Sequence, residues 1–243
     1  MNSKEIMVAS KVSKRFGGIK ALDNVDFILK RREIVGLIGP NGSGKTTLIN
    51  IMSGFYKPDG GRVFLDGEDV TNLPPYSRAL KGIARTFQLT KSFSNVSVFD
   101  NVMVGALLKS KDLSEAKNRT TALLKKIGLE NFSQRLCKEL PIGIKKKVEM
   151  ARALAIEPKI LLLDEVLAGL SVNEMDEILD FIASLKKVWN ISIVMVEHIV
   201  KAVVKVADRI VVLSSGQVIA EGLPEEIIRN PKIQEIYLGG KIL

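Results

Sequence analysis

One glycine-rich segment limits what this chain can fold into more than any other part of the sequence. It lies between the apolar runs 34–38 and 48–52, and it consists of Gly39, Pro40, Asn41, Gly42, Ser43, Gly44, Lys45, Thr46 and Thr47. Its spacing matches G-x-x-x-x-G-K-[ST], in which backbone N–H groups surround a phosphate chain, the lysine reaches the outer phosphates and the hydroxyl ligates Mg²⁺. The apolar flanks predict strand, loop and helix in that order. We therefore expect this segment, called the phosphate loop below, to bind a nucleotide.

The composition is that of a soluble globular protein. The chain has 243 residues, of which 46% are hydrophobic and 26% charged. This length allows one substantial core, so we expect a single domain with an inserted piece. No apolar run approaches the roughly 20 residues of a membrane span, and the N-terminus lacks the layout of a signal peptide. These features predict a cytosolic protein.

The net charge does not identify a partner, whereas the cysteine content excludes two kinds of site. The net charge of +9 is compatible with nucleic acid, an anionic membrane surface, bound polyphosphate or solubility alone, so it does not select a partner. The single cysteine, Cys137, excludes an internal disulfide and a cysteine metal cluster.

The segments around the phosphate loop have the alternation of half-buried strands. Residues 6–12 and 25–29 alternate apolar with polar, and residues 14–18 between them predict a turn that exposes Phe16. The Phe16 ring suits either stacking on an adenine or packing on the core. The Asp66-Gly67 pair predicts a hairpin. Residues 83–88 read as a strand that ends at the polar Gln88.

The middle of the chain changes to helical periodicity. Apolar residues recur at helical spacing in 98–108, 114–127 and 144–156, without a convincing strand pattern between them. We therefore predict an α-helical subdomain over 89–158, inserted into an α/β nucleotide-binding core formed by 1–88 and 159–243.

Two later apolar runs end in residues that suit phosphate chemistry. The run 159–163 precedes Asp164 and Glu165, and the run 191–196 precedes Glu197 and His198, the only histidine. Continuous apolar runs are typical of parallel strands covered on both faces, and ligands bind at the carboxyl ends of such strands. Asp164 would then hold Mg²⁺, Glu165 would activate water and His198 would hydrogen-bond a phosphate oxygen. Alternatively, the acidic pair caps the next helix and the histidine is an ordinary polar residue.

A helix start precedes the first of these runs. It comprises Leu140, Pro141, Ile142, Gly143 and Ile144, and three lysines at 145–147 follow it. Free N–H groups and positive charge at a helix N-terminus suit an anion. Lysine runs are also common on solvated faces, so this segment alone does not decide between the two roles.

The order of these motifs over nearly the whole chain resembles the ATP-binding subunit of ABC transporters. Residues 13–18, 83–88 and 228–239 look like the LivG-type subunit of branched-chain amino-acid importers, although ATPases of lipopolysaccharide exporters share much of this sequence. The resemblance implies an α/β fold of the P-loop NTPase (RecA-like) type, with an N-terminal antiparallel β subdomain and an inserted α-helical subdomain. The implied function is ATP hydrolysis coupled to solute transport.

The resemblance also assigns roles to individual residues. It implies ATP and Mg²⁺ as cofactors, with Phe16 stacking on adenine and residues 168–171 crossing a dimer interface. Gln88 would sense Mg²⁺ and the membrane partner, and His198 would contact the γ-phosphate. The implied catalytic residues are Lys45, Gln88, Glu165 and His198, and the implied Mg²⁺ ligands are Thr46, Gln88 and Asp164.

The implied partners are protein subunits rather than nucleic acid. The family pattern predicts a head-to-tail dimer with a second, homologous ATPase, transmembrane permease subunits and an extracytoplasmic solute-binding protein. The chain would lie in the cytoplasm, on the inner face of the cell membrane. A soluble ATPase of the same superfamily that acts on DNA or ribosomes usually has two such domains, a coiled coil or a zinc module, and none is visible in the sequence. A regulatory subunit that does not hydrolyse ATP conflicts with the intact Asp164, Glu165 and His198.

The sequence departs from the family pattern at residues 140–144, called the signature segment below. The usual Leu-Ser-Gly-Gly-Gln is replaced by Leu-Pro-Ile-Gly-Ile, so Pro141 removes a hydroxyl and an N–H, and Ile144 removes an amide. The N–H groups of Ile142 and Gly143 remain, with lysines 145–147 to compensate. We therefore expect a weakened signature segment and a complete ATP site of its own, hence two unequal sites in a heterodimer. Val166, where a proline is common, is expected to matter little.

Overall fold

The computed structural model describes residues 4–86 and 93–238, so Gln88 lies outside the described residues. None of the helices in these ranges combines the length and the apolar character needed to cross a bilayer. The strands are β1 (Glu5–Phe16), β2 (Ile19–Lys30), β3 (Ile34–Ile38), β4 (Gly60–Leu65), β5 (Glu68–Asp69), β6 (Ile83–Arg85), β7 (Ile160–Asp164), β8 (Ser192–Val196), β9 (Arg209–Ser214) and β10 (Gln217–Gly222). The helices are α1 (Lys45–Met52), α2 (Pro75–Leu80), α3 (Val98–Leu107), α4 (Leu113–Lys126), α5 (Ile142–Leu154), α6 (Val172–Trp189), α7 (Val200–Val206), α8 (Pro224–Arg229) and α9 (Pro231–Leu238), with 3-10 turns at Glu130–Phe132 and Cys137–Glu139.

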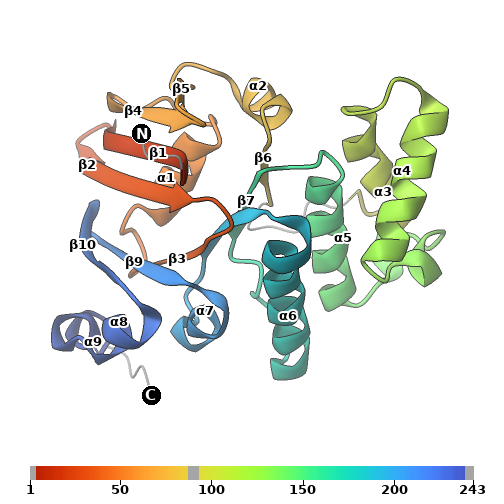
Figure 1. Ribbon diagram of the computed structural model, residues 1–243. Coiled ribbons are helices and arrows are strands. Elements are labelled where there is room, and N and C mark those ends of the chain that lie inside the picture. The colour runs from red at the N-terminus through yellow and green to blue at the C-terminus, as the bar shows by residue number, and fades with distance from the viewer. Residues whose placement is uncertain (1–3, 87–92, 239–243) are drawn as a thin grey trace.

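A six-stranded sheet forms the centre of the molecule, in the order β10-β9-β3-β8-β7-β6 (Figure 1). The five strands from β9 to β6 run parallel, and β10 pairs antiparallel with β9. Because β8 lies between β3 and β7, the carboxyl ends of these three strands meet at one edge of the sheet. That edge is where ligands bind in open α/β sheets.

The central strands are buried on both faces, as their continuous apolar sequences predict. In β7, Leu161 and Leu163 belong to one hydrophobic core and Ile160 and Leu162 to another. The first core includes residues of α3, α5 and α6, and the second lies between the sheet, α1 and the N-terminal strands. A third, smaller core joins β3 and β9 to α7 and α8. Side chains on the two faces of one strand thus pack into two different hydrophobic layers.

A second, antiparallel sheet of four strands has the order β2-β1-β4-β5. The predicted hairpin at Asp66 and Gly67 is present, and both residues have positive φ, at 50° and 84°, as a tight two-residue turn requires. The turn predicted over residues 14–18 is shorter in the structure. Strand β1 continues to Phe16, which pairs with Ile19, so only Gly17 and Gly18 form the turn. Cross-strand pairing thus overrides the local turn signal.

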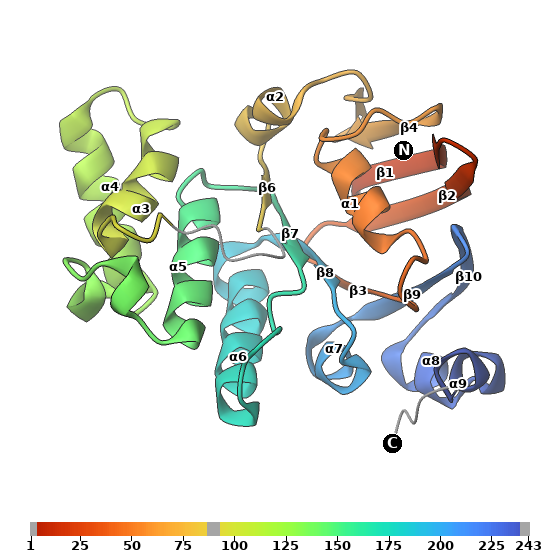
Figure 2. The same ribbon diagram turned by 180° about the vertical axis from the view of Figure 1, so that it is seen from behind.

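Helices α3, α4 and α5 stand together at one end of the molecule, beyond β6 and β7 (Figure 2). They share the first core with β7 and α6, so the helical segment packs continuously onto the sheet. Helix α5 begins at Ile142, two residues before the predicted start, and ends at Leu154 instead of 156. Pro141 is its N-cap residue, with the extended ψ of 154° that precedes a helix.

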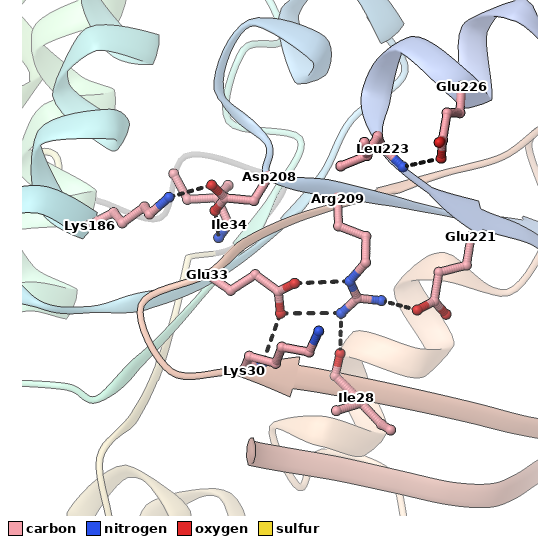
Figure 3. A network of polar contacts seen from close by, with 10 residues as sticks. All are labelled: Ile28, Lys30, Glu33, Ile34, Lys186, Asp208, Arg209, Glu221, Leu223 and Glu226. Atoms are coloured by element: carbon pink, nitrogen blue, oxygen red, sulfur yellow. Dashed lines mark hydrogen bonds and ion pairs between the residues drawn. The ribbon is translucent and has the colours of Figure 1, made fainter. Parts of the chain in front are cut away.

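The amino ends of β3 and β9 are fastened by a polar network around Arg209 (Figure 3). Its Nε donates to Glu33 Oε1 at 2.9 Å, and its terminal nitrogens donate to Glu33 Oε2 at 3.2 Å, Glu221 at 2.5 Å and the Ile28 carbonyl at 2.6 Å. One guanidinium therefore joins β2, the residue before β3, β9 and β10. This network lies at the amino ends of the strands, opposite the ends that carry the candidate site.

Candidate nucleotide site

The phosphate loop connects the buried strand β3 to α1, and two of its glycines are required by close backbone contacts. Gly39 and Gly44 have φ of 154° and 106°. A Cβ on Gly39 would lie 2.1 Å from the Leu213 carbonyl oxygen, and one on Gly44 would lie 2.5 Å from that of Ala21. The backbones of β9 and β2 therefore lie so close to the loop that only glycine fits at these two positions.

Lys45 begins α1 and is 5% exposed. Its Nζ donates to the carbonyl oxygens of Gly39 at 2.8 Å and Pro40 at 2.9 Å, which holds the ammonium inside the loop. Burial lowers the pKa of Lys45, and the negative charges of Glu165 and Asp164 oppose this effect. The lysine of the phosphate loop and the two carboxylates at the carboxyl end of β7 therefore interact electrostatically.

Glu165 and His198 follow the neighbouring strands β7 and β8. Glu165 Oε1 lies 2.6 Å from His198 Nε2. Glu165 has a positive φ of 51°, uncommon for a residue with a side chain, and its N–H donates to the Val196 carbonyl at 2.9 Å. The bond to β8 therefore holds the backbone in the conformation that brings the carboxylate to the imidazole.

One cavity of about 370 Å³ unites the residues predicted from three separate motifs. Residues 41–47 of the phosphate loop line it together with Glu165 and His198. The same cavity is lined by Ile19, Lys20, Ala21 and Ser215, which the sequence did not single out. Ser215 belongs to the β9–β10 turn, where the Gly216 N–H donates to the Ser43 carbonyl at 3.0 Å. Its only sequence signal was the turn itself.

Asp164 ends β7 and is 1% exposed. Its Oδ2 accepts a hydrogen bond from Arg85 at 2.9 Å, whereas Oδ1 is buried and accepts none from the described residues. Burial raises the pKa of Asp164, and the Arg85 charge opposes this effect. Mg²⁺ prefers oxygen ligands, so a buried carboxylate oxygen without a partner in the described chain, together with the Thr46 hydroxyl in the cavity, fits this ion.

Phe16 lies beside this cavity rather than in its lining. The ring is 43% exposed, meets the Tyr56 ring edge-on at a centroid distance of 5.3 Å, and has Lys14 Nζ 5.7 Å from its centroid. Ile19, its cross-strand partner, does line the cavity. The ring is thus exposed at the margin of the site, next to a second aromatic residue that the sequence analysis did not identify.

The signature segment lies against the start of α6 at Gly143. A Cβ on Gly143 would lie 3.1 Å from Glu174 Oε1, so the backbone there lies close to this carboxylate. Glu174 also accepts hydrogen bonds from the Ser171 N–H and hydroxyl at the start of α6, at 2.9 and 2.7 Å. A carboxylate of the same chain therefore lies beside the helix N-terminus that was predicted to receive a phosphate.

The three lysines after the signature segment do not converge on one point. Lys145 donates to the Lys138 carbonyl at 3.1 Å, and Lys147 pairs with Glu177 at 3.1 Å. Lys146 is 3% exposed. Helical geometry turns successive side chains by about 100°, so a run of three cannot face one anion.

Comparison with known proteins agrees with this geometry. Residues 22–168 match the sequence profile of ABC transporters. The chain is 38% identical over 252 residues to the high-affinity branched-chain amino acid transport ATP-binding protein LivG of Escherichia coli (strain K12), covering 98% of this chain and 99% of that protein.

Solved structures share the fold. The ADP conformation of MJ1267, an ATP-binding cassette of an ABC transporter, has a TM-score of 0.89 at 32% identity and covers 97% of this chain and 99% of that one. The dimeric post-hydrolysis state of the cassette MJ0796 with ADP and Pi has a TM-score of 0.80 at 27% identity, covering 90% and 99%. The predicted P-loop NTPase fold is therefore confirmed. On profile, near-full-length identity and fold, the chain belongs to the ABC transporter family, as an ATP-hydrolysing subunit.

Proposed function

We propose that this chain hydrolyses ATP to drive import of a branched-chain amino acid through a membrane permease. The observation that carries the chemistry is that Lys45, Glu165 and His198, from three separate motifs, line one cavity. The choice of solute rests on the 38% identity to the E. coli LivG protein, which extends over 98% of this chain.

The phosphate loop and its neighbours would bind the nucleotide. Backbone N–H groups of residues 41–47 cradle the phosphates, and the Lys45 ammonium neutralises their outer charge. The Ser43 hydroxyl, buried without a hydrogen-bond partner among the described residues, is a further donor. Phe16 would stack on the adenine from the margin of the cavity.

Thr46 and Asp164 would hold Mg²⁺, and the resemblance adds Gln88. When bound, Mg²⁺ supplies charge neutralisation on the terminal phosphates. The protein's own contribution would be a hydroxyl residue near the start of α1 and a buried carboxylate oxygen at the end of β7.

Glu165 would act as the general base and His198 as its positioning partner. Glu165 takes the proton from a water that attacks the terminal phosphorus, and the bond to ADP breaks as the new bond forms. The 2.6 Å contact between Glu165 Oε1 and His198 Nε2 restrains the carboxylate. His198 also offers a hydrogen bond to a phosphate oxygen.

A second, homologous ATPase would complete the working unit. The MJ0796 dimer with ADP and Pi, which shares this fold, supports a dimer here. In a head-to-tail arrangement, the signature segment of this chain would face the partner's nucleotide. It lacks the serine hydroxyl and the glutamine amide, so we propose that the nucleotide site completed by this segment is the weaker of the two.

A groove away from the nucleotide cavity would receive the permease. It has a volume of about 320 Å³ and includes Phe55, Tyr76, Val104 and Leu108, which are 50%, 71%, 47% and 55% exposed. Apolar side chains gathered at one concave surface favour a protein partner over solvent. Docking there would place the chain on the inner face of the cell membrane, with an extracytoplasmic binding protein that delivers the solute.

The test is uptake by the assembled transporter. The tagged chain is purified from its native membranes, and the complex with its copurifying permease and ATPase subunits is reconstituted in proteoliposomes with ATP inside. We expect uptake of radiolabelled leucine when the copurifying binding protein is present outside, and none with a Glu165→Gln chain. ATP-driven transport of another solute, without leucine uptake, would overturn the assignment of the solute but would not contradict the ATPase function.

A further inference from the structure

Arg85 is a buried residue at the end of β6 that contacts three residues in two other parts of the fold. Its side chain is 8% exposed, and one terminal nitrogen donates to Asp164 Oδ2 at 2.9 Å. The other donates to the Asn50 side-chain oxygen and, at 3.3 Å, to the Ser53 hydroxyl. The guanidinium therefore spans from the last turn of α1 to the carboxyl end of β7.

This contact makes the two oxygens of Asp164 unequal. Arg85 fixes Oδ2, while Oδ1 is buried and accepts no hydrogen bond within the described part of the chain. A carboxylate with one oxygen fixed cannot rotate freely, so the direction of the other oxygen is set as well. A buried carboxylate held through one oxygen only has a coordination position left for a cation.

We propose that Arg85 is a positioning residue for magnesium, which holds Oδ2 of Asp164 so that Oδ1 is presented to the ion. The proposal rests on the function proposed above, in which Asp164 and Thr46 hold Mg²⁺. In this proposal Arg85 acts on the ion through Asp164.

The geometry requires arginine rather than any cation. The planar guanidinium directs one nitrogen to Asp164 and the other to Asn50 at the same time, which a lysine ammonium on its flexible stem does not reproduce. A buried ion pair is weak support for a stabilising role alone, because desolvation offsets the attraction. Partners that orient a metal ligand are, by contrast, worth about 10 to 100-fold in metal affinity.

Arg78 supplies a matched control. It is 1% exposed, and its guanidinium donates to the carbonyls of Ile51 at 2.6 Å and Met52 at 2.9 Å, at the same end of α1. No hydrogen bond or ion pair joins it to Asp164 among the described contacts. Arg78→Lys therefore perturbs the same region without touching the proposed ligand.

The experiment measures metal affinity directly. Mn²⁺ replaces Mg²⁺, and its binding to the full chain with a non-hydrolysable ATP analogue is followed by electron paramagnetic resonance. Binding of the analogue without metal is measured separately. We expect Arg85→Lys to weaken Mn²⁺ binding by about tenfold or more and to leave metal-free nucleotide binding unchanged. Arg78→Lys should leave both affinities unchanged.

The outcomes separate the inference from the function. Equal Mn²⁺ affinity in wild type and Arg85→Lys, or equal losses in both lysine variants, overturns the role of Arg85 while ATP binding stands. A wild-type chain that binds no nucleotide overturns the proposed function itself. In an Asp164→Asn background, Arg85→Lys should add no further loss. If Arg85→Lys does not fold, Asn50→Ala, which releases the other arm of the guanidinium, must weaken Mn²⁺ binding; an unchanged affinity rejects the proposal.

Discussion

Glu165 Oε1 lies 2.6 Å from His198 Nε2, which joins residues that follow two adjacent strands. The register of the sheet produces this contact, because Asp164 of β7 pairs with Val196 of β8 and both strands end at the same level. The residues just beyond them therefore emerge side by side. Two residues 33 positions apart in sequence thus come into contact through the pairing of β7 with β8.

Glu165→Gln should separate binding from hydrolysis. The amide keeps the size of the side chain but cannot accept the proton of the attacking water, so we expect the ATPase rate to fall by about 10² to 10⁴-fold with ATP binding retained. Steady-state phosphate release and equilibrium nucleotide binding measure the two properties. Glu177→Gln, an exposed acid on α6, is the control and should hydrolyse ATP normally. Undiminished turnover in Glu165→Gln contradicts the role.

Lys45→Met should remove tight ATP binding. The methionine fills the space of the buried stem but carries no charge to offset the outer phosphates. A fluorescent-ATP titration measures the affinity. Lys20→Met is a matched control, because Lys20 lines the same cavity while its ammonium pairs with Asp23 at 2.5 Å. Equal affinity losses in the two variants would show that any positive charge in the cavity suffices.

Glu197→Gln should change how stability depends on pH. Burial raises the pKa of Glu197 from 4.5 to about 7. The folded chain thus holds this proton more tightly than the unfolded chain, and the stability gained is complete below pH 4.5 and lost as pH rises through about 7. The contribution is on the order of 3 kcal/mol.

The free energy of unfolding in urea at pH 5 and pH 8 tests this prediction. Glutamine does not titrate and can still accept from the Leu167 N–H, which donates to Glu197 at 2.9 Å. We expect the free energy of unfolding of the wild type, relative to that of Glu197→Gln, to be lower at pH 8 than at pH 5. Lys146 and Glu165, which act electrostatically on Glu197, are present in both chains, so their effects largely cancel in this difference. A difference that is the same at both pH values contradicts the assignment.

Pro141→Ser should raise the ATPase rate of the assembled complex. Serine restores a hydroxyl and a backbone N–H to the signature segment, each of which is worth about 1 kcal/mol or more, or roughly fivefold in rate. Phosphate release by the purified complex measures the ATPase rate. Ser171→Ala is not a suitable control, because it removes the cap of α6. Lys138→Ala, beside the segment and outside it, serves instead. An unchanged rate in Pro141→Ser would refute a weakened signature segment.

Arg209→Met should destabilise the fold without altering nucleotide binding. The change leaves Glu33 buried beside β3 without its cation, and breaking a buried pair costs about 3 kcal/mol or more. Urea denaturation measures the loss. Arg119→Met is the control, because the pairs of Arg119 with Glu115 and Glu157 are more exposed and should be worth about 1 kcal/mol or less. Similar losses of unfolding free energy in both variants would contradict a larger contribution from the buried Arg209 network.

Features that depend on neighbours along the chain were predictable from the amino-acid sequence. The phosphate loop, the apolar strands and the Asp66-Gly67 hairpin follow from local spacing, because turn geometry and strand burial are set by a few consecutive residues. The carboxyl-end rule then predicted that Glu165 and His198 would meet the loop, and the structure brings them to one cavity.

Contacts between side chains far apart in the sequence became visible only in the folded structure. The Arg85 contact with Asp164 spans 79 positions, and the close approach of Glu174 to Gly143 joins two helices. Neither has a local sequence signal beyond an arginine inside a short apolar strand and a glutamate three residues after a serine. Such contacts depend on how β6 lies against β7 and α5 against α6, and packing of separate elements is not encoded in the periodicity of any one of them.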